Sequence, residues 1–235
     1  MSGTIENCTF INCYANQSDL VLFDNEGTIT NSRFNNNSAL DGNMVYFQSA
    51  GLIDGCCFSE NNATYGGGVR FKSDGTVVNS IFEGNHADIG GAIYSSSGEL
   101  FVDACHFESN SANLGGAIRA AEGYLFLSNS TFVKNSADAG GAISLYDGRV
   151  INSNFSQNLA NLQGGAIYSS TMVMVDTCSF QNNIADDGGA MYCSNIGSVQ
   201  NSAFMDNTAV NNGGAIYLGF NGEASAVISV EIKLH

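Results

Sequence analysis

The sequence predicts an all-β fold, a right-handed parallel β-helix (a solenoid) of about nine coils, each with about 24 residues and three short strands. Three observations predict it. The 235-residue chain has 28 Gly, no Pro and only 12% charged residues, which disfavours long helices and favours turns between short strands. A pattern centred on Phe recurs along the whole chain. No six-residue rhythm, which would indicate a left-handed β-helix, is present.

The repeat is anchored on a Phe that recurs every 23 to 25 residues, so nine units cover the chain as one domain, 1–235. An aliphatic residue stands five positions before each Phe, Ser or Cys two before, and Ala five after. Asn stands three positions after Phe in eight units, and Cys13 takes that place in the first. The Phe and Asn motif residues are Phe34, Asn37, Phe58, Asn61, Phe82, Asn85, Phe107, Asn110, Phe132, Asn135, Phe155, Asn158, Phe180, Asn183, Phe204 and Asn207.

A Gly pair completes each unit, as in Gly90-Gly91-Ala92-Ile93, and it is intact in seven units. Three segments of each unit are short and rich in β-branched or aromatic residues: the one after the Gly pair, G-x-V, and [SC]-x-F. A leucine-rich repeat has a similar period but needs several Leu per unit, which this sequence lacks. Coils stacked at about 4.8 Å predict a rod about 43 Å long.

Alternation along each strand assigns the Phe, Val and post-Gly aliphatic columns to the interior. The Asn column is expected to form a ladder of stacked carboxamides that bond to neighbouring coils and to the backbone. The residue after the post-Gly aliphatic position then faces outward. That column predicts a possible binding stripe, because Tyr and Arg often anchor interfaces, although stacked rings that brace adjacent strands would explain it equally. Its residues are Tyr46, Arg70, Tyr94, Arg119, Tyr168, Tyr192 and Tyr217.

The paired motifs GGA[IVL] and F-x-x-N resemble the repeats of the chlamydial polymorphic membrane proteins. The resemblance covers essentially the whole chain, through Phe34-Asn37 to Phe204-Asn207 and Gly66-Gly67 to Gly213-Gly214. It implies a right-handed β-helical autotransporter passenger at the cell surface or secreted, which adheres to a host or neighbouring cell-surface protein or glycan. This sequence shows no signal peptide and no translocator barrel, and we expect it to be a fragment of a longer protein.

Several function classes are disfavoured. A net charge of −15 with seven basic residues argues against nucleic acid as a partner. No apolar run is long enough for a transmembrane segment. The seven Cys contain no C-x-x-C pair, so no zinc site is predicted. Four of them share one inward column in coils too far apart for disulfides, and we expect these four to be fillers interchangeable with Ser: Cys8, Cys56, Cys105 and Cys178. The roles of Cys57 and Cys193 stay open. The column of Asp88, Asp138 and Asp186 is interrupted, which leaves only weak, scattered calcium sites.

We expect no catalytic residues and no cofactor. Units of nearly constant length leave no room for the inserted loops that build a cleft in polysaccharide-active β-helices. Asp186-Asp187, the acidic pair near a bend, is expected to serve the turn before Gly188-Gly189, and the three His to decorate the surface. The sequence therefore predicts a non-enzymatic β-helical adhesin segment. A polysaccharide lyase or hydrolase with its catalytic loops outside this chain, and a purely structural spacer, remain the alternatives.

Overall fold

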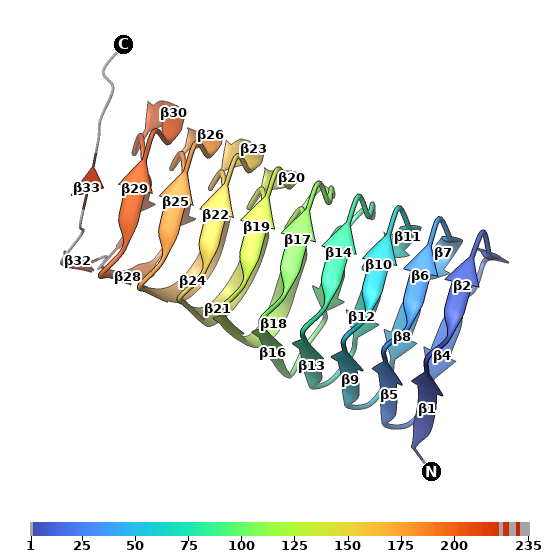
Figure 1. Cartoon of the computed structure of the whole chain (residues 1–235). Helices are drawn as coiled ribbons and strands as arrows, with labels where there is room; N and C mark the ends of the chain where they lie inside the picture. The colour runs from blue at the N-terminus through green and yellow to red at the C-terminus, as the bar shows by residue number, and fades with distance from the viewer. Residues whose placement is uncertain (1, 221–222, 226–228, 231–235) are drawn as a thin grey trace.

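The computed structural model describes residues 2–220, 223–225 and 229–230, and within them every regular element is a β-strand. The strands stack into a parallel solenoid whose axis runs from the N-terminal to the C-terminal coil (Figure 1). Each strand pairs with its counterpart about 24 residues away, as Phe58 does with Phe34 and Phe82. The predicted all-β fold of about nine coils is confirmed.

The largest sheet carries two sets of strands from each coil. The first set follows the Gly pair: β4 (Val21–Phe23), β8 (Val45–Phe47), β12 (Val69–Phe71), β15 (Ile93–Ser95), β27 (Met191–Cys193) and β31 (Ile216–Leu218). The second set contains the Val column: β1 (Gly3–Glu6), β5 (Gly27–Thr30), β9 (Gly51–Asp54), β13 (Gly75–Val78), β16 (Glu99–Asp103), β28 (Ile196–Gln200) and β32 (Glu223–Ser225). Three long strands join both sets: β18 (Ile118–Ser128), β21 (Ile143–Ile151) and β24 (Ile167–Asp176).

The second sheet holds the Phe column. Its strands are β2 (Thr9–Ile11), β6 (Arg33–Asn35), β10 (Cys57–Ser59), β14 (Ile81–Glu83), β17 (His106–Glu108), β19 (Thr131–Val133), β22 (Asn154–Ser156), β25 (Ser179–Gln181), β29 (Ala203–Met205) and β33 (Ser229–Val230). Consecutive rings from Phe10 to Phe204 stack face to face, with centroids 4.5–5.0 Å apart. In this stacked column the Phe side chains from Phe34 onward are at most 1% exposed and belong to the core.

A third, short-stranded sheet follows the Asn column, outside the three segments that the sequence predicts as strands. One part contains β3 (Tyr14–Asn16), β7 (Ser38–Asn43) and β11 (Asn62–Tyr65); the other contains β20 (Ser136–Ala139), β23 (Leu159–Gln163), β26 (Ile184–Asp187) and β30 (Thr208–Asn212). Isolated bridges at His86, Ser111, Ile89 and Leu114 connect the two parts. The solenoid is therefore walled by three parallel sheets.

The Asn column forms a continuous ladder inside the solenoid. Asn110 Nδ2 donates to Asn135 Oδ1 and to the carbonyl of Phe82, each at 3.0 Å. The backbone N–H of Asn110 donates to the same Asn135 Oδ1. This pattern recurs from Asn37 to Asn183, so each buried carboxamide satisfies a backbone carbonyl one coil below and a backbone amide.

The Gly pair is required by two separate constraints, illustrated by Gly90 and Gly91. Gly90 has φ +63°, the left-handed region that L side chains rarely adopt. A Cβ on Gly91 would clash with the backbone carbonyl oxygen of Gly116 in the next coil. The first Gly therefore makes the bend, and the second permits the close approach of adjacent coils.

Candidate functional site

The predicted binding stripe forms one row on the outer face of the largest sheet. Each member follows an apolar residue that packs in the core, such as Val69 before Arg70, and so points away from the core. Strand pairing places Arg70 beside both Tyr46 and Tyr94. The same row continues through Arg119, Ser144 and the three later tyrosines. We call Tyr46, Arg70, Tyr94, Arg119, Tyr168, Tyr192 and Tyr217 the Tyr/Arg stripe.

Arg70 occupies the centre of an aromatic cage. Its Cζ lies 4.8 Å from the ring centroid of Tyr46, 5.0 Å from that of Tyr65 and 5.3 Å from that of Tyr94. Such distances allow favourable cation–π contact. Tyr65 belongs to β11 of the third sheet and is not among the stripe residues predicted from the sequence. Its place directly before the Gly pair was the available signal, because the bend there returns the chain to the stripe.

Arg119 is held more deeply than its outward position suggests. Its guanidinium Nη1 donates to the Ser144 hydroxyl at 2.8 Å, and Ser144 is fully buried. Burial lowers the pKa of Arg119, while Tyr94 and Tyr168 act in the opposite direction. An Arg pKa starts so high that the group stays charged at neutral pH. Arg119 therefore adds a positive charge to the outer face of a strongly acidic chain.

The C-terminal part of the stripe is a stack of three tyrosine rings. Tyr168 and Tyr192 have centroids 5.8 Å apart, and Tyr192 and Tyr217 have centroids 4.5 Å apart with nearly parallel planes. Burial, followed by the neighbouring Tyr217 and Tyr168, raises the pKa of Tyr192. All seven stripe residues are half-buried. The arrangement can both brace adjacent coils and present ring faces and edges to a partner.

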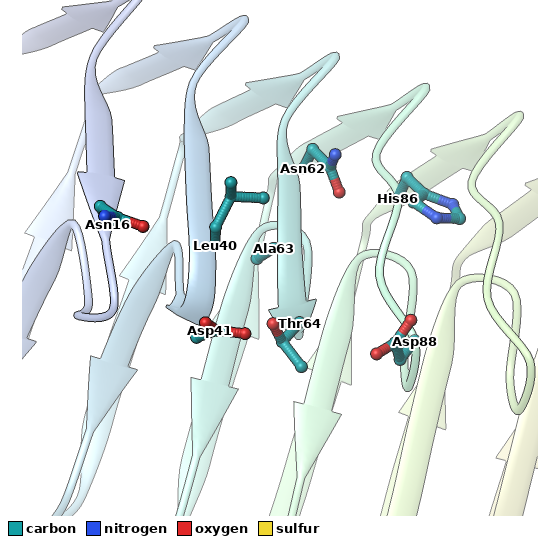
Figure 2. Close-up of a pocket in the computed structure, with 8 residues that line it drawn as sticks. All are labelled: Asn16, Leu40, Asp41, Asn62, Ala63, Thr64, His86 and Asp88. Carbon is teal, nitrogen blue, oxygen red and sulfur yellow. The ribbon is translucent and has the colours of Figure 1, made fainter.

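An open depression of about 320 Å³ lies over the third sheet (Figure 2). Figure 2 shows Asp41, Thr64 and Asp88 in a row across three coils, with His86 nearby. The His86 Nδ1 lies 2.9 Å from the Ser111 hydroxyl. The full lining of the depression is Asn16, Leu40, Asp41, Asn62, Ala63, Thr64, His86 and Asp88. Among the described residues no group of three His, Cys, Asp or Glu side chains could hold a metal ion.

The other ionisable residues that could take part in chemistry have local hydrogen-bond partners. Asp187 accepts hydrogen bonds from the backbone and side chain of Asn212, at 3.0 and 2.9 Å, which ties it to the bend. His106 lies on the outer face of β17, with Nδ1 2.6 Å from the Thr131 hydroxyl and Nε2 3.4 Å from the Glu108 carboxylate. His235 lies outside the described residues.

The seven cysteines are all free thiols. Three of the four cysteines in the Ser/Cys column are buried: Cys56, Cys105 and Cys178. In the described part of the chain, none of these thiols has a positive charge beside it that would favour the thiolate. Burial raises the pKa of Cys105 to about 12 and that of Cys178 to about 11. A thiol is a nucleophile as the thiolate, so these buried groups act as packing residues.

Comparison with protein-family models gives two matches that agree with this geometry. Residues 1–149 match the model described as the right handed beta helix region. The chain belongs to this β-helix family. Two later segments of the β-helix, residues 152–170 and 201–219, match the Chlamydia polymorphic membrane protein repeat. Each contains one Phe–Asn motif and one Gly pair, such as Phe155-Asn158 with Gly164-Gly165.

Curated proteins and solved structures gave no match to this β-helix. In the part of the chain that the structure describes, no helix is long and apolar enough to span a membrane.

Proposed function

We propose that this β-helix is a non-enzymatic passenger segment, displayed at a cell surface or secreted, that binds a protein or glycan of a host or neighbouring cell. The polymorphic-membrane-protein repeats at residues 152–170 and 201–219 support surface display. We further propose that residues 1–235 act as one β-helical unit and that the Tyr/Arg stripe is its contact surface.

One observation carries the proposal: the stripe gathers large aromatic and cationic side chains into a single row on the outside of an acidic rod. Tyr and Arg are enriched where interfaces derive their binding energy, because they offer rigid area and directed donors. The stripe is also preorganised. Arg70 is held by three rings, and Tyr192 by two, so binding would cost little side-chain entropy.

The test replaces Tyr168, Tyr192 and Tyr217 together with Ser and measures adhesion of protein-coated beads to candidate cells and glycan arrays. We expect adhesion of the parent to be lost while the β-sheet circular dichroism signal is kept. The matched control replaces Tyr14 and Tyr146 with Ser, since these tyrosines are 61% and 46% exposed and lie outside the stripe. Adhesion that survives in the triple variant would exclude the stripe as the contact surface. A lower melting temperature with unchanged adhesion would assign it to bracing alone.

A further inference from the structure

A second surface on the same sheet is exposed and apolar, and neither the repeat nor the stripe accounts for it. It lies where β16, β18, β21, β24 and β28 run side by side along the solenoid (Figure 1). We call Phe101, Tyr124, Phe126, Met172, Met174 and Ile196 the apolar patch. Four of them, Phe101, Phe126, Met174 and Ile196, are 39–43% exposed.

Register shows that the patch consists of two apolar groups, one on each side of a coil that carries Asp147 and Arg149. Phe101 pairs with Phe126 in the next coil. The following coil places Arg149 in this column, and the coil after that places Met174 there. In the adjacent outward column Tyr124, Asp147, Met172 and Ile196 follow one another in successive coils. The rings of Tyr124 and Phe126 lie 4.4 Å apart. Clustered exposed apolar side chains on a soluble protein mark a contact site, whereas scattered ones do not.

The charges around the patch specify the partner. The three outward columns of these five strands contain four acidic residues, Glu99, Asp103, Asp147 and Asp176, against one basic residue, Arg149. Asp103 and Asp176 are held in place by hydrogen bonds from Asn129 and Asn201, at 2.6 and 2.9 Å. A cationic partner complements this rim, while a second copy of this chain, with net charge −15, does not.

Asp147 adds an independent observation. It sits between Tyr124 and Met172 in its column, at a bulge in the pairing of β21. Its Oδ1 is buried and has no hydrogen-bond partner among the described residues. A buried carboxylate oxygen without a donor is unfavourable. Asp147 as a whole is only half-buried, so its carboxylate offers the Lys or Arg of a partner a negative charge at the centre of the patch.

The dimensions favour a helix as the occupant. From β16 to β28 is four coil steps, about 19 Å at about 4.8 Å per step, which an α-helix of about 13 residues spans. Outward columns two residues apart are about 7 Å from each other, so a helix about 10 Å wide reaches from the apolar columns to the acidic rim. From these observations we infer that the apolar patch docks a basic amphipathic helix of a partner protein, with its apolar side on Phe101, Phe126 and Met174 and its Lys or Arg on Asp147 and the rim.

The experiment uses three fluorescein-labelled synthetic helical peptides of equal length: a Lys/Leu amphipathic peptide, a Glu/Leu peptide of the same pattern, and a Lys/Ser peptide without an apolar side. Fluorescence anisotropy measures binding to the full chain. We expect the Lys/Leu peptide to bind, and the other two to bind at least tenfold more weakly. Equal binding of the Lys/Ser peptide would reduce the effect to general attraction by an acidic protein, and equal binding of the Glu/Leu peptide would remove the role of the rim. Either result overturns the inference.

Variants then locate the contact. Phe101→Ser with Phe126→Ser should weaken Lys/Leu binding at least tenfold, and Asp147→Asn several-fold. The Tyr14→Ser with Leu162→Ser protein is the matched control and should bind as the parent does, because these residues are 61% and 55% exposed and lie on the third sheet. Undiminished binding by the Phe variant overturns the inference. If that variant does not fold, Met174→Ser with Ile196→Ser tests the same patch. The Tyr168, Tyr192 and Tyr217 triple variant should keep peptide binding, so failure of this inference and failure of the proposed function are separable.

Discussion

Phe132 and Val133 are adjacent on β19, yet they belong to different parts of the molecule. Phe132 is fully buried and stacks between Phe107 and Phe155 with centroid distances of 4.6 and 4.8 Å. Val133 faces outward, in a column where its neighbours are Glu108 and Ser156. The inward column holds Phe in coil after coil, whereas the outward column varies along the solenoid. The repeat thus encodes the interior, and the exterior is free to carry function.

The outer face itself contains two contrasting regions. The side chains of the Tyr/Arg stripe are half-buried and contact one another, as Arg70 does with three rings. The apolar patch is more exposed, and the Oδ1 of its Asp147 has no hydrogen-bond donor among the described residues. Stripe residues should therefore contribute to stability as well as to binding, and patch residues to binding alone. Substitutions at the core, the ladder and the outer face test whether the loss of stability decreases with distance from the core.

The largest effect is expected at the Phe stack. Phe132→Ala should lower the free energy of unfolding by about 3–5 kcal/mol, because it leaves a cavity between two fixed rings. Val133→Ala, the matched control, should cost less than about 1 kcal/mol. Chemical denaturation of both variants measures the difference. Equal losses would mean that inside and outside are wrongly assigned on this sheet.

The Asn ladder should respond next. Asn135→Asp removes the two donors that serve Asn158 Oδ1 and the Phe107 carbonyl, at about 1–3 kcal/mol for two lost buried hydrogen bonds. Burial raises the pKa of such a carboxyl, so the folded state holds its proton longer than the unfolded state. The variant should regain stability as pH falls. Asn154→Asp, on the exposed face of β22, is the control, and identical pH profiles for the two would contradict the ladder's role.

Cys105 predicts a smaller effect that is confined to alkaline solution. Burial raises its pKa from 9.0 to about 12. Between these values the unfolded chain releases the proton that the folded chain retains, so stability falls as pH rises. Cys105→Ser introduces the residue found in this column at Ser80 and Ser130. It should reduce the loss of folding stability between pH 8 and 10.5 by about 1–2 kcal/mol. Cys57→Ser, on the outer face, serves as the control. Parallel pH–stability curves for parent and Cys105→Ser would refute this.

The smallest of these effects belongs to the stripe. Arg70→Ala should cost about 1 kcal/mol, since the cation–π contacts with Tyr46, Tyr65 and Tyr94 are partly solvated. Arg33 lies on the exposed outer face of β6, and Arg33→Ala should leave the melting temperature unchanged. If both variants melt as the parent does, the stripe does not brace the coils, and its rings are available for binding only.

Much of this architecture was predictable because the columns are set by packing between identical neighbours. The Phe stack, the Asn ladder and the single row of the Tyr/Arg stripe follow from spacing and alternation. The strand at the third sheet was not predictable in the same way, since its outward residues vary and only its Ala is constant. Tyr65 contacts Arg70 across the bend at the Gly pair. Spacing within the repeat assigns each residue to a column but does not show contacts across a bend.

The long strands β18, β21 and β24 were also missed. In coils such as 69–77 the chain leaves β12, bends at Lys72 and Ser73 and then enters β13, whereas in these three coils one strand runs through that corner. Bulges between Ala120 and Tyr124 absorb the extra residues. The apolar patch did leave a signal in Leu125-Phe126-Leu127: in three consecutive apolar residues of a strand, alternation sends the middle one outward.

The parallel pairing has a mechanical consequence. Every described pair of strands joins neighbouring coils, so the hydrogen bonds between them point along the rod. A pull along the axis therefore loads these bonds lengthwise, and a coil that has one neighbour instead of two yields first. Each detached coil of about 24 residues releases about 80 Å of extended chain. Under tension the molecule lengthens in even steps, one coil at a time, while the coils that remain keep their inner stack and their outer faces.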